Sequence, residues 1–433
     1  VYTLADAIWV SGKGPSALTA VGFFFPFMML AVALAVGLGV GGGAAISQRI
    51  GARNHKEASS VAIHTIVLMG ILSIVYSIPA VIFVKQLFLL MGAGEALPLT
   101  VTYARIMFAG SVLIFSIHVA SALLRSEGDA KRAMNAILIG TILNIFLDPV
   151  FIYRVAVTLP FGHTMNLGLD LGVAGAAYAT VLSMGVSSLI LFYWLVIQKK
   201  TYVAISFRKF RFRKNILYDI LKVGIPAALS QMSMALMMFF ITKLITMITG
   251  DTGVAVFTTG WRVVMIAVLP LVGIATAVTS VSGAAFGGRE YDKLQTAFMY
   301  AVRIGFILEL VLAVSTLIFA PYIANVFTWS RDTALLRDDI IVLLRTVWLF
   351  YPAVAFGMLS SAMFQGVGKG VNSLIITIAR TLLLSVPLAA LFGILFNMGM
   401  QGIYAGIVCG SWLASVSAFI WARSFIRGLL KQA

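Results

Sequence analysis

Long apolar stretches, separated by short polar breaks, run through almost the whole chain. These stretches exceed the roughly 18–20 residues that a helix needs to cross a bilayer. They show no alternation of apolar and polar residues with a period of two, which argues against strands. Because a helix satisfies its own backbone hydrogen bonds in lipid, the pattern predicts an all-α integral membrane protein.

Breaks in the apolar pattern predict about twelve transmembrane helices. We expect them at residues 1–11 (partial), 16–47, 58–90, 98–125, 131–157, 172–198, 215–248, 253–286, 293–327, 335–365, 371–397 and 400–427. Since the chain opens inside the first of these, we expect further residues to precede Val1. Several runs exceed one bilayer thickness, so we expect tilted or kinked helices.

Basic residues gather in every second break, and this sets the expected orientation. The richer breaks lie near residues 49–56, 125–132, 199–214, 289–293, 369 and 423–431. The positive-inside rule places these breaks in the cytoplasm. Both chain ends and Lys209 are then cytoplasmic, while Gly162 and Arg331 are external.

The two halves of the chain resemble each other in sequence. "GAAISQRIGARNHKEA" (43–58) corresponds to "SVSGAAFGGREYDKLQ" (280–295), and "LLRSEGDAKRA" (123–133) to "MFQGVGKGVNS" (363–373). A basic linker at 199–214 separates an N-terminal lobe at 1–198 from a C-terminal lobe at 215–433. With six helices in each lobe, we expect two pseudo-symmetric lobes around a central cavity.

Composition agrees with a membrane protein and excludes other classes. Of the 433 residues, 61% are hydrophobic and 11% are charged, whereas soluble domains have about 25% charged residues. The net charge of +16 sits at helix ends and forms no basic patch with interleaved aromatics, so we expect no nucleic-acid partner. The four histidines and one cysteine form no catalytic pattern, so we do not expect an enzyme.

Two carboxylates inside apolar runs are the strongest functional signal. Asn144 and Asp148 are four residues apart, which places them on one face of a helix. Asp6 lies in the first run, with Tyr2 on the same face. A charged residue in the bilayer costs at least about 2.5–3.5 kcal/mol, so it normally has a partner or a function.

The second half lacks both carboxylates. Asp6 corresponds to an apolar stretch near Leu244, and Asp148 to Val386, just before Pro387. The prolines of the two halves correspond, so the proline belongs to the scaffold and the acids are special to the first half.

Several motifs, in this order along the chain, resemble the multidrug and toxic compound extrusion (MATE) family, in particular its prokaryotic DinF-like branch. They are "LADAIWVSGKG" (4–14), "SQRIGARN" (47–54), "LLRSEGDAKRAM" (123–134), "LNIFLDPVFI" (143–152) and "GVAGAAYATVLS" (172–183). The resemblance implies secondary active export of amphipathic or cationic compounds from a prokaryotic cell, across the plasma membrane, in exchange for H⁺ or Na⁺.

The resemblance also implies a cation site, formed here by Asp6, Asn144, Asp148 and Thr180, with Tyr2 nearby. If the ion is Na⁺, these four residues are its ligands; no other cofactor is expected. His118 and Ser121 stand where several relatives have asparagines. His118 is either a packing residue or part of a proton relay, and the second reading favours H⁺.

For the other polar and polarisable residues, more than one interpretation remains open. Met28, Trp261 and Met265 line a substrate cavity or pack in lipid. The intramembrane charges are mutually paired, reach a surface, or form a second site; they are Lys243, Arg262, Arg303, Glu309, Arg345 and Arg380. Convergence of Arg262, Arg345 and Arg380 would favour a flippase for lipid-linked sugars, and a channel is a further alternative. We expect a monomer in contact with membrane lipid.

Overall fold

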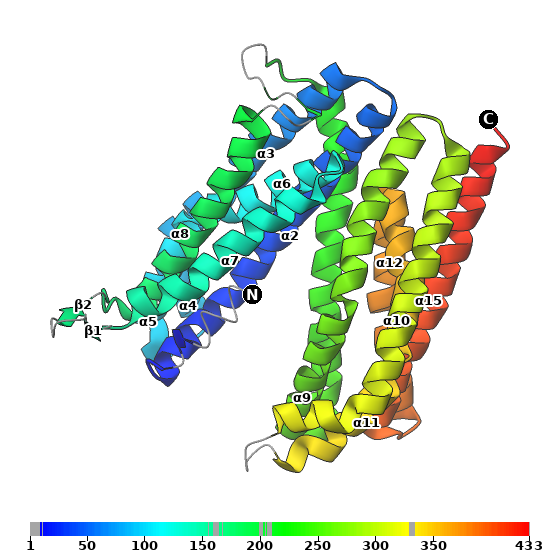
Figure 1. The fold of residues 1–433 in the computed structure, drawn as a ribbon. Helices are drawn as coiled ribbons and strands as arrows, with labels where there is room; N and C mark the ends of the chain where they lie inside the picture. The colour runs from blue at the N-terminus through cyan, green and yellow to red at the C-terminus, as the bar shows by residue number, and fades with distance from the viewer. Residues whose placement is uncertain are drawn as a thin grey trace. The chain divides into compact units, whose positions relative to one another are not determined.

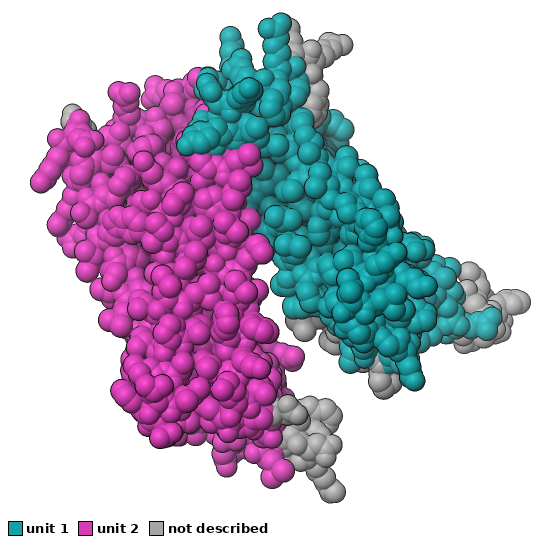
Figure 2. Space-filling view, turned by 180° about the vertical axis from the view of Figure 1, so that it is seen from behind, with its two compact units in different colours: residues 1–46, 55–220 teal, residues 47–54, 221–433 magenta. Residues whose placement is uncertain are grey.

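The computed structural model describes residues 9–10, 12–154, 156–158, 164–166, 168–198, 202–203, 205, 210–328 and 334–432. The chain forms two compact units, Val1–Ile46 with His55–Ile220, and Ser47–Asn54 with Leu221–Ala433 (Figure 2). The short segment at the end of the first long helix therefore packs with the second unit. The lobe boundaries at 198 and 215 stay a prediction.

The first unit is a helix bundle with one small hairpin (Figure 1). Its elements are α2 (Pro15–Gly51), α3 (His55–Ile82), α4 (Val84–Leu90), the 3₁₀ turn η1 (Gly94–Ala96), α5 (Leu97–Ala109), α6 (Ser111–Ser126), α7 (Ala130–Ile152), β1 (Ala156–Thr158), β2 (Thr164–Asn166), α8 (Gly172–Phe192) and the π-helical η2 (Tyr193–Ile197).

The second unit begins within the longest helix, α9. Its elements are α9 (Lys214–Gly287), α10 (Tyr291–Phe327), the 3₁₀ turn η4 (Ala334–Leu336), α11 (Arg337–Val347), α12 (Phe350–Gly366), α13 (Gly370–Ile378), η5 (Ala379–Ser385), α14 (Val386–Ala390), η6 (Leu391–Leu395) and α15 (Gly399–Leu430). Gly250 has a non-helical backbone and divides α9 into two spans. Two π-helical segments, η5 and η6, flank α14.

The predicted all-α class is confirmed. Nine described helices are long and apolar enough to cross a membrane, and eleven spans result when two bent helix pairs are each counted as one. The pairs bend by 43° between α5 and α6 and by 49° between α11 and α12. The expected twelfth span, at residues 1–11, lies mostly outside the described residues. The antiparallel β1–β2 hairpin was not predicted, because three-residue strands are too short to show a period.

The internal repeat extends to the conformation of the backbone. Positive φ angles recur at corresponding turns of the two halves, and non-glycine residues seldom adopt them. The pairs are Arg53 and Arg289, both at 57°, Gly128 and Gly368, Asp170 and Asn397, and Gly172 and Gly399. The two bent helix pairs also occupy corresponding places in the halves.

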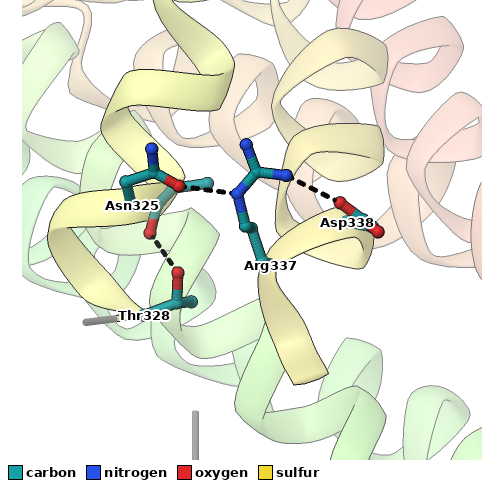
Figure 3. A network of polar contacts seen from close by, with 5 residues as sticks. Asn325, Thr328, Arg337 and Asp338 are labelled. Carbon is teal, nitrogen blue, oxygen red and sulfur yellow. Dashed lines mark hydrogen bonds and ion pairs between the residues drawn. The ribbon is translucent and has the colours of Figure 1, made fainter. Parts of the chain in front are cut away.

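Polar contacts join α10 to α11 in the second unit (Figure 3). Arg337 donates from Nε to Asn325 Oδ1 at 2.6 Å and forms an ion pair with Asp338 at 3.0 Å. Thr328 Oγ1 caps the preceding turn by donating to the Ala324 carbonyl at 2.9 Å. These contacts fix where α10 ends and α11 begins.

Candidate functional site

Helix α7 carries the two polar residues that the sequence singled out. Its start is fixed by Asp129, whose carboxylate accepts from the Arg132 backbone N–H at 3.1 Å and pairs with the Arg132 guanidinium at 3.2 Å. Asn144 and Asp148 follow on one buried face. Pro149 has no N–H to donate, so the helical hydrogen bond to the Ile145 carbonyl is not made.

A hydrogen-bonded group of three buried side chains joins α7 to α8. Asn144 donates from Nδ2 to Asp148 Oδ1 at 2.8 Å and to Thr180 Oγ1 at 3.3 Å. The exposed fractions of Asn144, Asp148 and Thr180 are 0%, 0% and 1%. Asn144 Oδ1 receives no hydrogen bond from the described residues. The group therefore offers carboxylate, amide and hydroxyl oxygens within one buried cluster.

Close packing of α7 on α8 brings Thr180 to this group. The two helices lie against each other along their lengths. At Gly175, an added Cβ would lie 2.3 Å from the Phe151 carbonyl oxygen, so only glycine permits this approach. Gly175 stands five residues before Thr180, and Phe151 three residues after Asp148. The glycine thus sets the distance across the site.

Residues near the start of the chain contact Tyr153, at the end of α7. The Tyr153 hydroxyl donates to the Trp9 carbonyl, and the two rings meet edge to face at 6.4 Å. Lys13 lies 5.1 Å from the centre of the Tyr153 ring and forms a 2.8 Å ion pair with Asp170. The hydrogen bond from Lys13, with its charge, holds the pKa of Asp170 below its usual range. Asp6 and Tyr2, the other predicted site residues here, lie outside the described residues.

The remaining predicted site residues of the first unit, His118, Ser121 and Met28, lie on helices other than α7 and α8. His118 is half-buried on α6, and no hydrogen bond between described residues joins it to Asn144, Asp148 or Thr180. Ser121 is buried on the same helix, and its hydroxyl has no partner there. Met28 is buried in α2. Their predicted roles as relay or substrate-lining residues stay predictions.

The second unit holds a cavity of about 90 Å³ that sequence reasoning only partly anticipated. Trp261 and Met265 of α9 line it, together with Phe350 and Met358 of α12. Arg380, in the π-helical η5, also lines it. A sequence pattern does not show a π-helical segment, so the direction of Arg380 could not be foreseen.

No ion pair between described residues joins any two of the intramembrane charges of the second half, whereas four of the six reach a surface, as one of the interpretations expected. Lys243, Arg262, Arg303 and Arg345 are exposed, whereas Glu309 and Arg380 are buried. Neither oxygen of the Glu309 carboxyl has a hydrogen-bond partner among the described residues. No ion pair between described residues joins an exposed charge to either buried one.

Comparison with known proteins decides the family. The sequence matches the MatE family over residues 1–150 and 226–391. The chain belongs to the MatE family. This is a family of membrane transporters, so the protein is a multi-pass membrane transporter and not an enzyme.

Named MatE relatives align over nearly the whole chain. The multidrug export protein MepA of Staphylococcus aureus (strain MSSA476) is 24% identical over 413 residues, covering 93% of this chain and 84% of MepA. A crystal structure of MATE in the bent conformation is 46% identical, with a TM-score of 0.92, covering 100% of this chain and 92% of that chain.

A further solved structure concerns a MOP superfamily transporter from Pyrococcus furiosus Vc1. It is 46% identical, with a TM-score of 0.91, covering 99% of this chain and 92% of that chain. For that protein, the reverse polarity of the binding pocket is described as pointing to a different function.

Proposed function

We propose that the protein is a secondary active antiporter that exports amphipathic, cationic small molecules in exchange for H⁺ or Na⁺. The observation that carries this proposal is the buried group of Asn144, Asp148 and Thr180, which holds a carboxylate inside a membrane-spanning helix. A bound cation would neutralise that carboxylate, and its release would leave the charge to be stabilised by the Asn144 amide. A site with these two states can exchange an ion for a substrate during alternating access.

The orientation of the Asn144 amide bears on which ion is used. Its nitrogen faces Asp148 and Thr180, an arrangement that suits a bare or protonated carboxylate. Binding of Na⁺ would require the amide to turn so that Oδ1 faces the ion, because Na⁺ takes oxygen ligands. We therefore propose H⁺ as the first coupling ion to test, with Na⁺ as the alternative.

Asp6 completes the proposed site. The family resemblance is what supports Asp6 as the second carboxylate. We also propose that the protein lies in the plasma membrane of a prokaryote with both termini in the cytoplasm, and that it is a monomer.

The rival functions have less support. The flippase required three arginines to converge, but of Arg262, Arg345 and Arg380 only Arg380 lines the cavity of the second unit. A channel would need no coupling site.

Dye efflux from cells tests the proposal. We expect Asp148→Asn and Asp6→Asn each to abolish efflux at unchanged protein level in the membrane, whereas Ile145→Leu, at an exposed α7 position, serves as the control. Normal efflux in both Asp variants would overturn the cation-site proposal.

A further inference from the structure

The cavity of the second unit is apolar on all sides except one. Met234, Met237, Met238, Met265 and Met358 contribute five of its side chains. Trp261 packs against Phe350 with ring centres 5.4 Å apart and gives the cavity a flat aromatic wall. Arg380 is its one charged residue, beside the hydroxyl residues Thr381 and Ser385.

Arg380 is a buried cation without a counter-charge in the described part of the chain. Its exposed fraction is 7%, and the guanidinium is charged at every physiological pH. The ion pairs of the described residues do not include it, and Glu309, the other buried charged residue of this unit, is not within ion-pair distance. A buried charge of this kind is costly unless an anion pairs with it.

The local backbone holds Arg380 in an uncommon segment. Residues 379–385 form the π-helical η5, and Ser385 Oγ donates to the Arg380 carbonyl at 2.6 Å. π-helical segments inside helices occur frequently at functional sites. This helix corresponds, in the internal repeat, to the α7 helix with Asp148, and Pro387 corresponds to Pro149. Arg380 stands seven residues before Pro387, whereas Asp148 directly precedes Pro149, so the two buried charges lie on corresponding helices at different positions.

We propose that this cavity binds the acid group of an amphipathic anion, with Arg380 as the ligand of a carboxylate, sulfonate or phosphate. The guanidinium offers paired N–H donors that match such groups. The aromatic wall and the methionines receive the apolar part of the molecule. The inference rests on the proposed function only in naming acidic amphiphiles as a second class of substrate; the binding itself does not depend on transport.

The size and the edge of the cavity fit this ligand class. A volume of about 90 Å³ is several times the roughly 10–15 Å³ that a single water needs, so an acid group and the first apolar atoms have room. Methionine side chains are unbranched and re-pack around different shapes. Met265 lines the cavity and is 56% exposed, so a longer tail leaves past this residue.

Fluorescent binding measurements on the purified full chain in uncharged detergent test the proposal. The probes are 1-anilinonaphthalene-8-sulfonate and its neutral analogue N-phenyl-1-naphthylamine, which share an apolar body and differ in the acid group. We expect Arg380→Met to weaken sulfonate binding at least about tenfold, since a charge-assisted pair is lost, and to leave binding of the neutral probe unchanged. Arg380→Lys should be intermediate, and Arg262→Met, which removes an exposed charge of α9 outside the cavity, should bind both probes as the wild type does.

Thermal melting separates ligand binding from a structural role. Without ligand, we expect Arg380→Met to melt at or above the wild-type temperature, because replacing an unpaired buried charge by an apolar group removes its desolvation cost. Equal sulfonate binding by wild type and Arg380→Met would overturn the inference, and so would a large loss of stability in that variant with unchanged probe affinity.

Two further arms identify the source of the anion and separate this inference from the proposed function. An acidic lipid that co-purifies with the wild type, and not with Arg380→Met, supports the site with a membrane lipid as its occupant; sulfonate binding without retained lipid supports it with a soluble acid. If Asp148→Asn stops cation export while Arg380→Met binds the sulfonate normally, the inference fails and the proposed function stands. If the sulfonate binds through Arg380 but no gradient drives export, the inference stands and the proposed function fails.

Discussion

Asn144 donates a hydrogen bond from Nδ2 to Asp148 Oδ1 at 2.8 Å, one helical turn further along α7. The same nitrogen reaches Thr180 Oγ1 at 3.3 Å on α8. One amide thus orients the carboxylate and links the two helices that enclose it.

We predict unequal effects of replacing Asn144 and Thr180, the other two members of the buried group. Asn144→Leu should abolish dye efflux, because the buried carboxylate loses the hydrogen bond from the Asn144 amide. Thr180→Val should reduce efflux only about threefold to tenfold, since a neutral hydrogen bond contributes about 0.5–1.5 kcal/mol. Thr180→Ser, which keeps the hydroxyl, is the matched control. Equal efflux by Asn144→Leu and wild type would contradict this order.

The sequence predicted the pairing of Asn144 with Asp148 because both lie on one helix, where spacing alone fixes neighbours. Thr180 was predicted only from the family resemblance, because the spacing of residues along one helix does not show which residues of another helix pack against it. The bend between α5 and α6 and the π-helical segment at Arg380 were missed for the same reason: tertiary contacts set them. Asp6 stays a prediction.

Glu127, in the turn after α6, predicts a pH dependence of stability. Its Oε2 accepts from the Tyr202 N–H at 2.8 Å. Burial raises the pKa of Glu127 to about 7, against the lowering effect of the backbone hydrogen bonds from Tyr202 and Val203. The folded protein therefore holds a proton that the unfolded chain releases at lower pH. The associated stability is present at acid pH and is lost as the pH rises through about 7.

Melting of Glu127→Gln checks this sign. Near pH 5 the variant and the wild type should melt alike, whereas near pH 8 the variant should melt higher, because glutamine has no charge to bury. A constant difference across this range would show that Glu127 does not titrate there.

Gly51 is predicted to be intolerant of substitution. An added Cβ would lie 1.8 Å from the Ala284 carbonyl oxygen, within the second unit. Gly51→Ala should therefore lower the melting temperature by several degrees, because backbone atoms must shift. Gly70→Ala, in α3 with nothing within 4 Å, should be neutral or stabilising. The prediction fails if both variants melt alike.

Labelling of single cysteines tests the orientation of the chain in the membrane. After replacement of Cys409, which is exposed, single cysteines at positions 209, 162 and 331 should react differently with an impermeant thiol reagent. We expect labelling from outside at 162 and 331 only, as the distribution of basic residues requires. External labelling at 209 would reverse the proposed topology.

The central claim is that Asp148 holds the coupling cation, and transport by purified protein in liposomes tests it most directly. A H⁺ gradient without Na⁺, and a Na⁺ gradient at constant pH, are imposed separately while the movement of a cationic dye is recorded. We expect at least one gradient, H⁺ first, to drive dye movement by the wild type and by Ile145→Leu, and neither gradient to drive it in Asp148→Asn. Gradient-driven transport by Asp148→Asn at the wild-type rate, or dye movement in the wild type that no gradient accelerates, would contradict the account.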